Sequence, residues 1–196
     1  MPPLRRLCVY AGSNAGARPA YADAAAALAR ELAARGVGLV YGGGKVGLMG
    51  VLADAVLAAG GEAIGVIPHA LVDREVAHAG LTDLRVVGSM HERKALMAEL
   101  AGGFVAVPGG IGTLEELIEV LTWSQLGIHA KPCAVLNIAG YFYALTTFLD
   151  HAVAEGFLTQ AHRDTIMVES EPGVLLERLR AYEKPTGAPL MGRANR

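Results

Sequence analysis

The sequence is poor in cysteine and carries almost no excess charge. Its 196 residues include two cysteines, Cys8 and Cys133, and each falls in a predicted buried strand. Two free thiols in a cytoplasmic protein are therefore expected in place of a disulfide. The formal net charge of −2 argues against a nucleic-acid binder that works through a basic patch.

Long apolar runs and metal-binding motifs are also missing. No apolar run is long enough to span a membrane, and residues 1–12 (MPPLRRLCVYAG) lack the layout of a signal peptide. No two histidines are spaced i, i+4, and the HERKA that begins at His91 is not the zinc-binding H-E-x-x-H. The sequence therefore predicts a cytoplasmic protein without a metal site.

Glycine, in contrast, is abundant and clustered. It makes up 25 of the 196 residues, about twice its usual share, and gathers at points where the backbone must approach something closely. With 53% apolar and 18% charged residues, the chain is expected to form a single globular domain over residues 1–183. Residues 184–196, with two prolines and two glycines, are expected to be a loose tail.

Apolar strands alternate with helices along the chain. The predicted strands are LCVYAG, VGLVYGGG, EAIGVIP, LRVV, FVAVPGG, CAVLNIAG and TIMVES. The predicted helices are 19–36, 47–61, 89–103, 114–126, 141–154 and 173–182. This pattern indicates a doubly wound, Rossmann-like α/β fold whose parallel sheet has helices on both faces. Ligands bind such folds beyond the carboxyl ends of the strands, where the glycine turns lie. The irregular segment 69–82 is a candidate active-site loop.

The first glycine turn, GGGKVG at residues 42–47, matches the dinucleotide fingerprint G-x-G-x-x-G only formally. The next strand ends in VIPH and has its acid, Glu62, at the wrong end to bind a ribose. A Walker loop is excluded because Lys45 is followed by Val46 instead of serine or threonine. Two interpretations stay open: the glycines let the following helix pack tightly on the sheet, or they contact a nucleotide.

The second glycine turn lies in VPGGIGTLEELIEVLTW, residues 107–123. Pro108 closes a strand, and Thr113 is predicted to cap the helix that follows. The N–H groups and the dipole at this helix start favour an anion, above all a phosphate. Glu115 and Glu116 follow at once, although acids in a first turn also stabilise the helix dipole by ~0.3–1 kcal/mol each. For Glu119, a solvated face is the default interpretation.

Helix geometry sets Glu116 apart from its neighbours. At about 100° per residue, the core stripe of this helix is predicted to consist of Leu114, Leu117, Ile118 and Leu121. Glu116 points nearly opposite, in line with Val120 and Trp123. That second apolar stripe needs a cover, which a partner subunit would supply. A carboxylate half-buried at such an interface is a candidate for chemistry.

A second helix supplies the opposite charge. Ser89 and Glu92 have capping-box spacing, so this helix is predicted to begin at Met90. Arg93 and Lys94 share its largely apolar face and lie near its positive end, where cations are unfavourable. Either their stems snorkel along the surface, or both reach an anionic ligand, with Arg93 suited to forked contacts.

A sugar phosphate suits this combination. Its phosphate would bind the turn, with added charge from Arg93 and Lys94, while Glu116 faces another part of the same ligand. Breaking a glycosidic bond builds positive charge on the sugar ring, and a carboxylate can stabilise that charge or activate the attacking water. A phosphate bound far from the reacting carbon also supplies binding energy that orients the substrate.

These motifs resemble those of the Lonely Guy family of cytokinin-activating phosphoribohydrolases. Pro108 to Glu116 match the family's marker P-G-G-x-G-T-x-x-E, and CVYAGSN, GGGKVGLMG, SMHERKALM and GTLEELIEVLTWSQLGIHAKP are also similar to it. The resemblance implies hydrolysis of nucleoside 5′-monophosphates, typically N6-modified adenosine monophosphates, to free base and ribose 5-phosphate, without a cofactor. It also implies a homodimer with active sites near the subunit interface.

The resemblance further implies roles for individual residues. Arg93 and Glu116 correspond to the catalytic pair. The substrate-binding residues would be Gly12, Ser13, Gly43, Gly44, Glu75, Lys94, Gly109, Gly110, Ile111, Gly112, Thr113, Leu114, Glu115 and Thr122. The GSN that begins at Gly12 departs from the two serines that relatives often have, which is expected to alter contacts and not chemistry.

Two other functions stay open at this point. The same fold could carry a nucleotide or nucleotide cofactor without catalysis, although a carrier has no need of the Glu116 carboxylate. Members of the family have also been labelled lysine decarboxylases. That activity would require pyridoxal phosphate bound by a lysine and an acidic partner for its ring nitrogen. No lysine is placed for that role, since Lys94 is better used on phosphate. The sequence does not reveal the preferred base; His91, Met97 and the loop near Glu75 are candidates for the base pocket.

Overall fold

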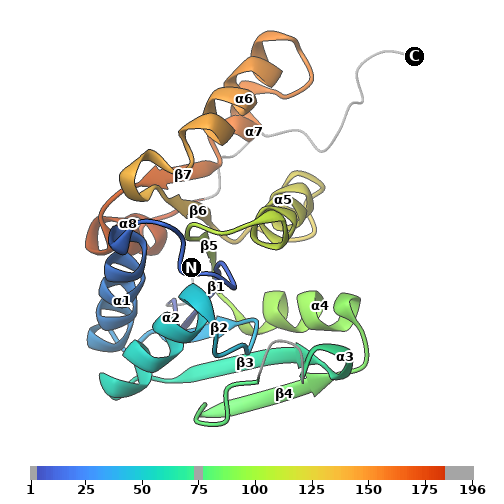
Figure 1. Cartoon of the computed structure of the whole chain (residues 1–196). Coiled ribbons are helices and arrows are strands. Elements are labelled where there is room, and N and C mark those ends of the chain that lie inside the picture. The colour runs from blue at the N-terminus through green and yellow to red at the C-terminus, as the bar shows by residue number, and fades with distance from the viewer. Residues whose placement is uncertain (1–3, 73–76, 184–196) are drawn as a thin grey trace.

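The structure, a computed structural model, describes residues 4–72 and 77–183. Its centre is one sheet of seven parallel strands in the order β4-β3-β2-β1-β5-β6-β7 (Figure 1). The strands are β1 (Arg6–Tyr10), β2 (Gly38–Tyr41), β3 (Ala63–Pro68), β4 (Asp83–Val87), β5 (Phe104–Ala106), β6 (Cys133–Leu136) and β7 (Ile166–Glu169). All seven predicted strands are present, and the doubly wound α/β fold is confirmed.

Helices cover both faces of this sheet. They are α1 (Pro19–Ala34), α2 (Gly47–Ala58), α3 (His69–Val72), α4 (Met90–Leu100), α5 (Ile111–Gln125), α6 (Tyr143–Ala154), α7 (Gln160–Arg163) and α8 (Pro172–Arg180), with a short 3-10 turn η1 (Ile138–Gly140). Successive side chains of a strand point to opposite faces, so each strand contributes to two hydrophobic cores.

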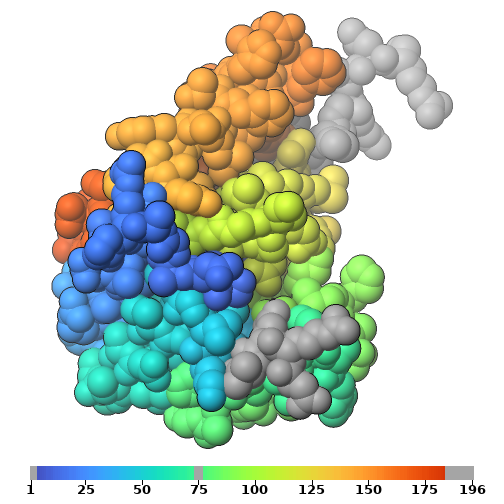
Figure 2. All heavy atoms as spheres, in the orientation of Figure 1, coloured from blue at the N-terminus to red at the C-terminus, as the bar shows by residue number. Residues whose placement is uncertain are grey.

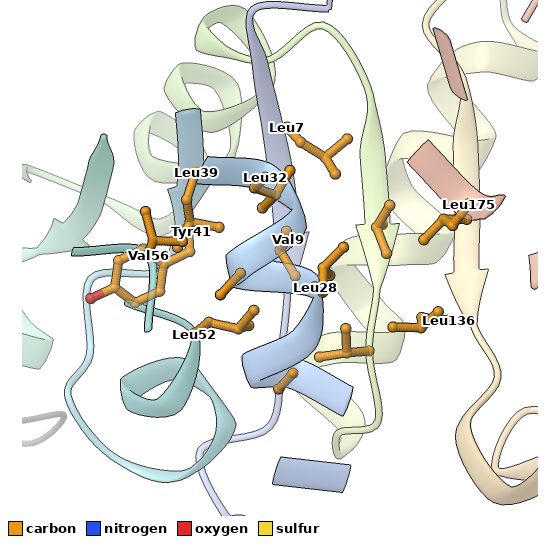
Figure 3. Packing of buried hydrophobic residues seen from close by; sticks show 14 of the residues in the cluster. Leu7, Val9, Leu28, Leu32, Leu39, Tyr41, Leu52, Val56, Leu136 and Leu175 are labelled. Carbon is orange, nitrogen blue, oxygen red and sulfur yellow. The ribbon is translucent and has the colours of Figure 1, made fainter. Parts of the chain in front are cut away.

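The two cores divide the helices between them. Leu7 and Val9 of β1 join buried residues of α1, α2 and α8, whereas Cys8 and Tyr10 join those of α4 and α5. Figure 3 shows the first core, in which Leu28 packs over β1. The central strands read as continuous apolar runs because both of their faces are covered. Both cysteines are buried and free, as predicted.

Several boundaries differ from the predicted ones. α5 begins at Ile111, three residues before the predicted start. Part of the segment predicted to be irregular forms the single turn α3, which is too short to produce a helical apolar pattern. Glu75 and the predicted tail, residues 184–196, lie outside the described residues.

Helices α6 and α7 stand away from the sheet and form a projecting arm (Figures 1 and 2). None of the described residues of α6 is buried. Across residues 4–72 and 77–183, no helix combines the length and the apolar character needed to cross a membrane.

Candidate active site

A cleft lies at the carboxyl ends of β1 and β5, where the strand order reverses direction. It has two adjoining cavities that share Gly12, Ser13 and Gly110. The first, of about 240 Å³, contains Tyr21 and Tyr141 and is called the tyrosine cavity below. The second, of about 270 Å³, contains Arg93 and Glu116 and is called the arginine cavity. Open α/β sheets bind their ligands at this switch point.

Backbone contacts around Gly12 hold the cleft together. The Gly12 N–H donates to Pro108 O (3.1 Å), and Gly12 O accepts from the N–H of Leu48 (2.9 Å) at the start of α2. Gly47 has a φ of +58°, and a Cβ there would overlap the backbone of Ser13. The first glycine turn therefore packs α2 against the segment after β1, and the first N–H groups of α2 are used on protein.

The start of α5 is different. Its N-cap is Gly110, with no side-chain cap. Thr113 is therefore not the cap that the sequence predicts, because the glycines let the helix begin earlier and leave Thr113 buried against Gly109. Among the residues that the structure describes, no acceptor is found for the N–H groups of residues 110–113. These donors lie at the positive end of the helix dipole, which favours an anion.

Arg93 forms part of the wall of the arginine cavity and is only 5% exposed. Its Nη2 donates to Gly42 O (3.1 Å), and Nη1 lies 3.7 Å from the Met90 sulfur. A Cβ on Gly42 would overlap Nη2, so this approach requires glycine. Arg93 thus reaches over the strand ends, and the snorkelling interpretation does not apply to it. The helix that carries it begins at Met90, as predicted, with Ser89 accepting from the N–H of Glu92 (3.1 Å).

Lys94 turns instead toward two acids of α5. Its Nζ bonds to Glu115 Oε1 (2.5 Å) and Glu119 Oε1 (3.0 Å). Burial by itself would lower the pKa of the Lys94 ammonium, but the bonds to Glu115 and Glu119 outweigh that effect and raise the pKa above its ordinary value. Lys94 lines neither cavity. The solvated-face interpretation of Glu119 is wrong, because its side chain is 24% exposed and is paired with Lys94.

Glu116 lies half-buried in the arginine cavity with Arg93. The carboxylate influences Cys8, which is buried in the second core. Burial raises the pKa of the Cys8 thiol, and the negative charge of Glu116 raises that pKa further. A carboxylate beside such a core acts through a medium that screens it less than bulk water does. A positive charge that develops in the cavity would therefore be attracted to the Glu116 carboxylate.

The predicted stripes of α5 are rotated in the structure. The side of the helix that faces the sheet carries Thr113, Leu117 and Val120. Ile118, predicted to lie in the core, is 40% exposed. Trp123 is half-buried and lines a separate groove of about 480 Å³ against α4. The unpartnered apolar stripe therefore runs through Ile111 and Ile118 instead of Val120 and Trp123.

The cleft gathers most, though not all, of the predicted binding residues. The two cavities together contain Gly12, Ser13, Gly109, Gly110, Ile111, Gly112, Thr113 and Glu115. Five others line neither cavity: Gly43, Gly44, Lys94, Leu114 and Thr122. Glu75 lies outside the described residues.

Lys94 is paired with Glu115 and Glu119, and the other four residues also have contacts outside the cleft. Gly43 O accepts from the N–H of His78 (3.0 Å), and Gly44 forms a β-bridge with Ala77. Leu114 packs in the second core, and the Thr122 hydroxyl donates to Ile118 O (2.8 Å) on its own helix.

Sequence reasoning missed several lining residues, among them five with large side chains. Met49, Leu71 and Met90 form an apolar wall of the arginine cavity, and Tyr21 and Tyr141 line the tyrosine cavity. Each comes from a different part of the chain. Proximity to a strand end was an available signal for Leu71, Met90 and Tyr141, which closely follow the ends of β3, β4 and β6.

Comparison with known proteins identifies the chain's relatives. A family model described as "Possible lysine decarboxylase" matches residues 49–179. A "Probable cytokinin riboside 5'-monophosphate phosphoribohydrolase" of Oryza sativa subsp. japonica is 52% identical over 91% of this chain and 79% of its own length. A cytokinin riboside 5'-monophosphate phosphoribohydrolase of Arabidopsis thaliana is 48% identical over 92% of this chain and 83% of its own length. The chain belongs to the Lonely Guy family.

Solved structures of more distant proteins share the fold of this Lonely Guy family member. The molybdenum cofactor carrier protein of Chlamydomonas reinhardtii superposes with a TM-score of 0.69 over 91% of this chain and 99% of the carrier. The molybdenum cofactor binding protein of Rippkaea orientalis gives a TM-score of 0.67. Sequence identity to these two proteins is 21% and 20%, so the comparison extends to the fold alone.

The contact between Gly42 and Arg93 can be tested by a double-mutant cycle in this Lonely Guy protein. Gly42→Ala is expected to lower the free energy of unfolding by ~1–3 kcal/mol, because its methyl group displaces the buried guanidinium. In an Arg93→Ala background the same substitution should cost much less. Urea unfolding measures both. Gly173→Ala, where the nearest side-chain atom would be 3.4 Å away, is the control. Equal costs in both backgrounds would contradict the contact.

Proposed function

We propose that this protein hydrolyses the N-glycosidic bond of adenosine 5′-monophosphates, N6-modified ones such as cytokinin riboside monophosphates among them, to free base and ribose 5-phosphate. One observation carries the proposal: Glu116 and Arg93 face the same cavity as the donor-rich start of α5. The relatives at 52% and 48% identity bear the name of this activity.

The start of α5 is suited to the substrate's phosphate. The backbone N–H groups of residues 110–113 supply hydrogen-bond donors, and the helix dipole favours a negative charge there. Neither contribution depends on a charged side chain. The negative charge of Glu115 beside this site is offset by Lys94. Lys94 would thus assist phosphate binding indirectly, by neutralising an acid, and not by touching the phosphate.

Glu116 would act at the sugar. In hydrolysis a water oxygen bonds to C1′ of the ribose, the C1′–N9 bond breaks, and its electron pair leaves with the base, which takes up a proton. Positive charge develops on the ribose ring as the bond breaks. The Glu116 carboxylate can stabilise that charge or accept a proton from the attacking water. Arg93, in the wall of the same cavity, would help to hold the anionic substrate.

Lysine decarboxylation, which the description of the family model names, fits the residues poorly. The chemistry requires pyridoxal phosphate held by a lysine. The chain has four lysines, of which Lys45, Lys94 and Lys131 are described. Lys94 is paired with two glutamates, and Lys131 donates to Ala98 O (2.6 Å) in the groove beside Trp123. None of these three lysines lines the cleft.

Glu116→Gln separates the hydrolase from a carrier. Wild-type protein is incubated with AMP and, separately, with N6-isopentenyl-AMP, and the released base is measured by chromatography. The substitution should lower the rate of base release by ~10²–10⁴-fold, because glutamine neither carries charge nor accepts a proton, while AMP binding is retained. Glu119→Gln, on the same helix but paired with Lys94, is the matched control and should stay active. Tight AMP binding by the wild type without release of base would instead indicate a carrier.

We also propose a homodimer, supported by the exposed apolar stripe of α5. Ile111 and Ile118 lie two turns apart on one side of the helix, and Ile128 follows its end; their side chains are 88%, 40% and 65% exposed. Exposed apolar surface of this kind marks a contact site. Because Ile111 lines the arginine cavity, a second copy on this stripe would border the active site.

Light scattering after gel filtration tests the dimer. The wild type should have twice the chain mass of 20.4 kDa, and Ile118→Asp should shift it toward the monomer because a charge cannot be buried unpaired. Val174→Asp, at a similarly exposed valine of α8 on the other side of the sheet, should leave the mass unchanged. A wild type that runs as a monomer would refute the proposal.

A further inference from the structure

Tyr141, which follows β6, makes a hydrogen bond to the backbone of the second glycine turn. Its hydroxyl donates a hydrogen bond to Gly109 O, 32 residues earlier in the chain. Its ring packs edge-on against Tyr21, with 5.7 Å between the ring centroids. The next residue, Phe142, is 1% exposed and belongs to the second core, whereas Tyr141 is 41% exposed. Packing in the hydrophobic core therefore does not explain the position of the Tyr141 side chain.

An unusual turn places Tyr141 over the cleft. After β6, the Asn137 N–H donates to Glu169 O (2.6 Å), and Asn137 Oδ1 accepts from the N–H of Phe142 (2.7 Å). Between these two bonds Ala139 has a φ of 49°. This left-handed conformation is unfavourable for a residue with a side chain and persists only where its surroundings enforce it. The turn thus returns Tyr141 from the end of β6 to the end of β5.

The bond to Gly109 O fixes a peptide that would otherwise rotate easily. Gly109 and Gly110 flank this peptide, and neither has a side chain to restrict its backbone. In a trans peptide the C=O and N–H groups point in opposite directions. Holding Gly109 O toward Tyr141 therefore directs the Gly110 N–H away from Tyr141. Within residues 4–72 and 77–183, no second donor to Gly109 O is found.

The neighbouring carbonyl is held in the same manner. Pro108 O accepts from the N–H of Gly12 (3.1 Å), so two successive carbonyls of the turn are bound to donors outside it. Both bonds use carbonyl oxygens of the turn as acceptors. The N–H groups at the start of α5 therefore stay available to a ligand. A phosphate, which has acceptors alone when ionised, needs that arrangement.

We propose that Tyr141 is a positioning residue for phosphate binding: its hydroxyl keeps the Gly109–Gly110 peptide oriented so that the first N–H groups of α5 face the substrate's phosphate. The inference rests on the proposed function and adds a residue to it. It concerns the phosphate alone, so a ligand without a phosphate is unaffected by the loss of the hydroxyl.

The test compares AMP with adenosine by calorimetry. Every protein carries Glu116→Gln so that AMP is not consumed during the titration. Adding Tyr141→Phe should weaken AMP binding by about three- to tenfold, the effect of one hydrogen bond, and leave adenosine binding unchanged. Adding Tyr143→Phe instead, at a tyrosine that is 66% exposed and whose hydroxyl bonds to no described residue, should change neither affinity.

Two other results of the titrations would overturn the inference. Unchanged AMP affinity in Tyr141→Phe would show that the hydroxyl does not position the turn. An equal loss for AMP and adenosine would show that Tyr141 supports the cleft as a whole and not the phosphate. Base release by otherwise wild-type protein is measured separately: its absence would refute the proposed hydrolysis, while a selective loss of AMP affinity would still support the role of Tyr141.

Discussion

The cleft depends on three backbone segments that approach one another without side chains between them. The segment after β1 bonds to the end of β5 through the N–H of Gly12, and to the start of α2 through the Gly12 carbonyl. A Cβ on Gly47 would overlap Ser13, and one on Gly109 would overlap Thr113. Glycine is conformationally costly in a folded chain, and the structure concentrates it where two helices must begin close to β1. The cavities lie between these helix starts.

Charge balance at the start of α5 follows from this geometry. A helix start that attracts anions would be a poor site if the acids beside it were unpaired. Lys94 of α4 binds both Glu115 and Glu119, whereas Glu116 lies beside Glu115 in the arginine cavity, in whose wall Arg93 also lies. A glycine turn that favours anions and a carboxylate next to it are therefore compatible: in the proposed function, the turn would bind the phosphate of the substrate and the carboxylate would act at its sugar.

The sequence predicts the sheet well and the surroundings of the site only in part. Strands that are buried on both faces appear in the sequence as continuous apolar runs. A capping box, such as the one that begins at Ser89, is a short local motif that marks where a helix starts. Periodicity could not orient α5, because apolar residues occur around most of its circumference and the side facing the sheet is decided by tertiary packing. Only one of the four residues assigned to its core stripe, Leu117, is fully buried.

Contacts between distant segments were beyond the reach of local patterns. Lys94 and Glu115 are 21 residues apart, and Tyr141 and Gly109 are 32 residues apart. No spacing rule connects such pairs, since their proximity depends on strand order. The residues of the PGGIGTLEE segment were found because they are adjacent in sequence. Arg93 and Lys94 of α4 were also predicted as site residues, but the pairing of Lys94 with Glu115 and the bond from Tyr141 to Gly109 required the fold.

A crystal structure of the Glu116→Gln protein with AMP tests the central claim most directly. We expect the phosphate oxygens within hydrogen-bonding distance of the N–H groups of residues 110–113, and C1′ of the ribose beside residue 116 in the arginine cavity. A phosphate bound elsewhere, with the base or sugar occupying the start of α5, would contradict it.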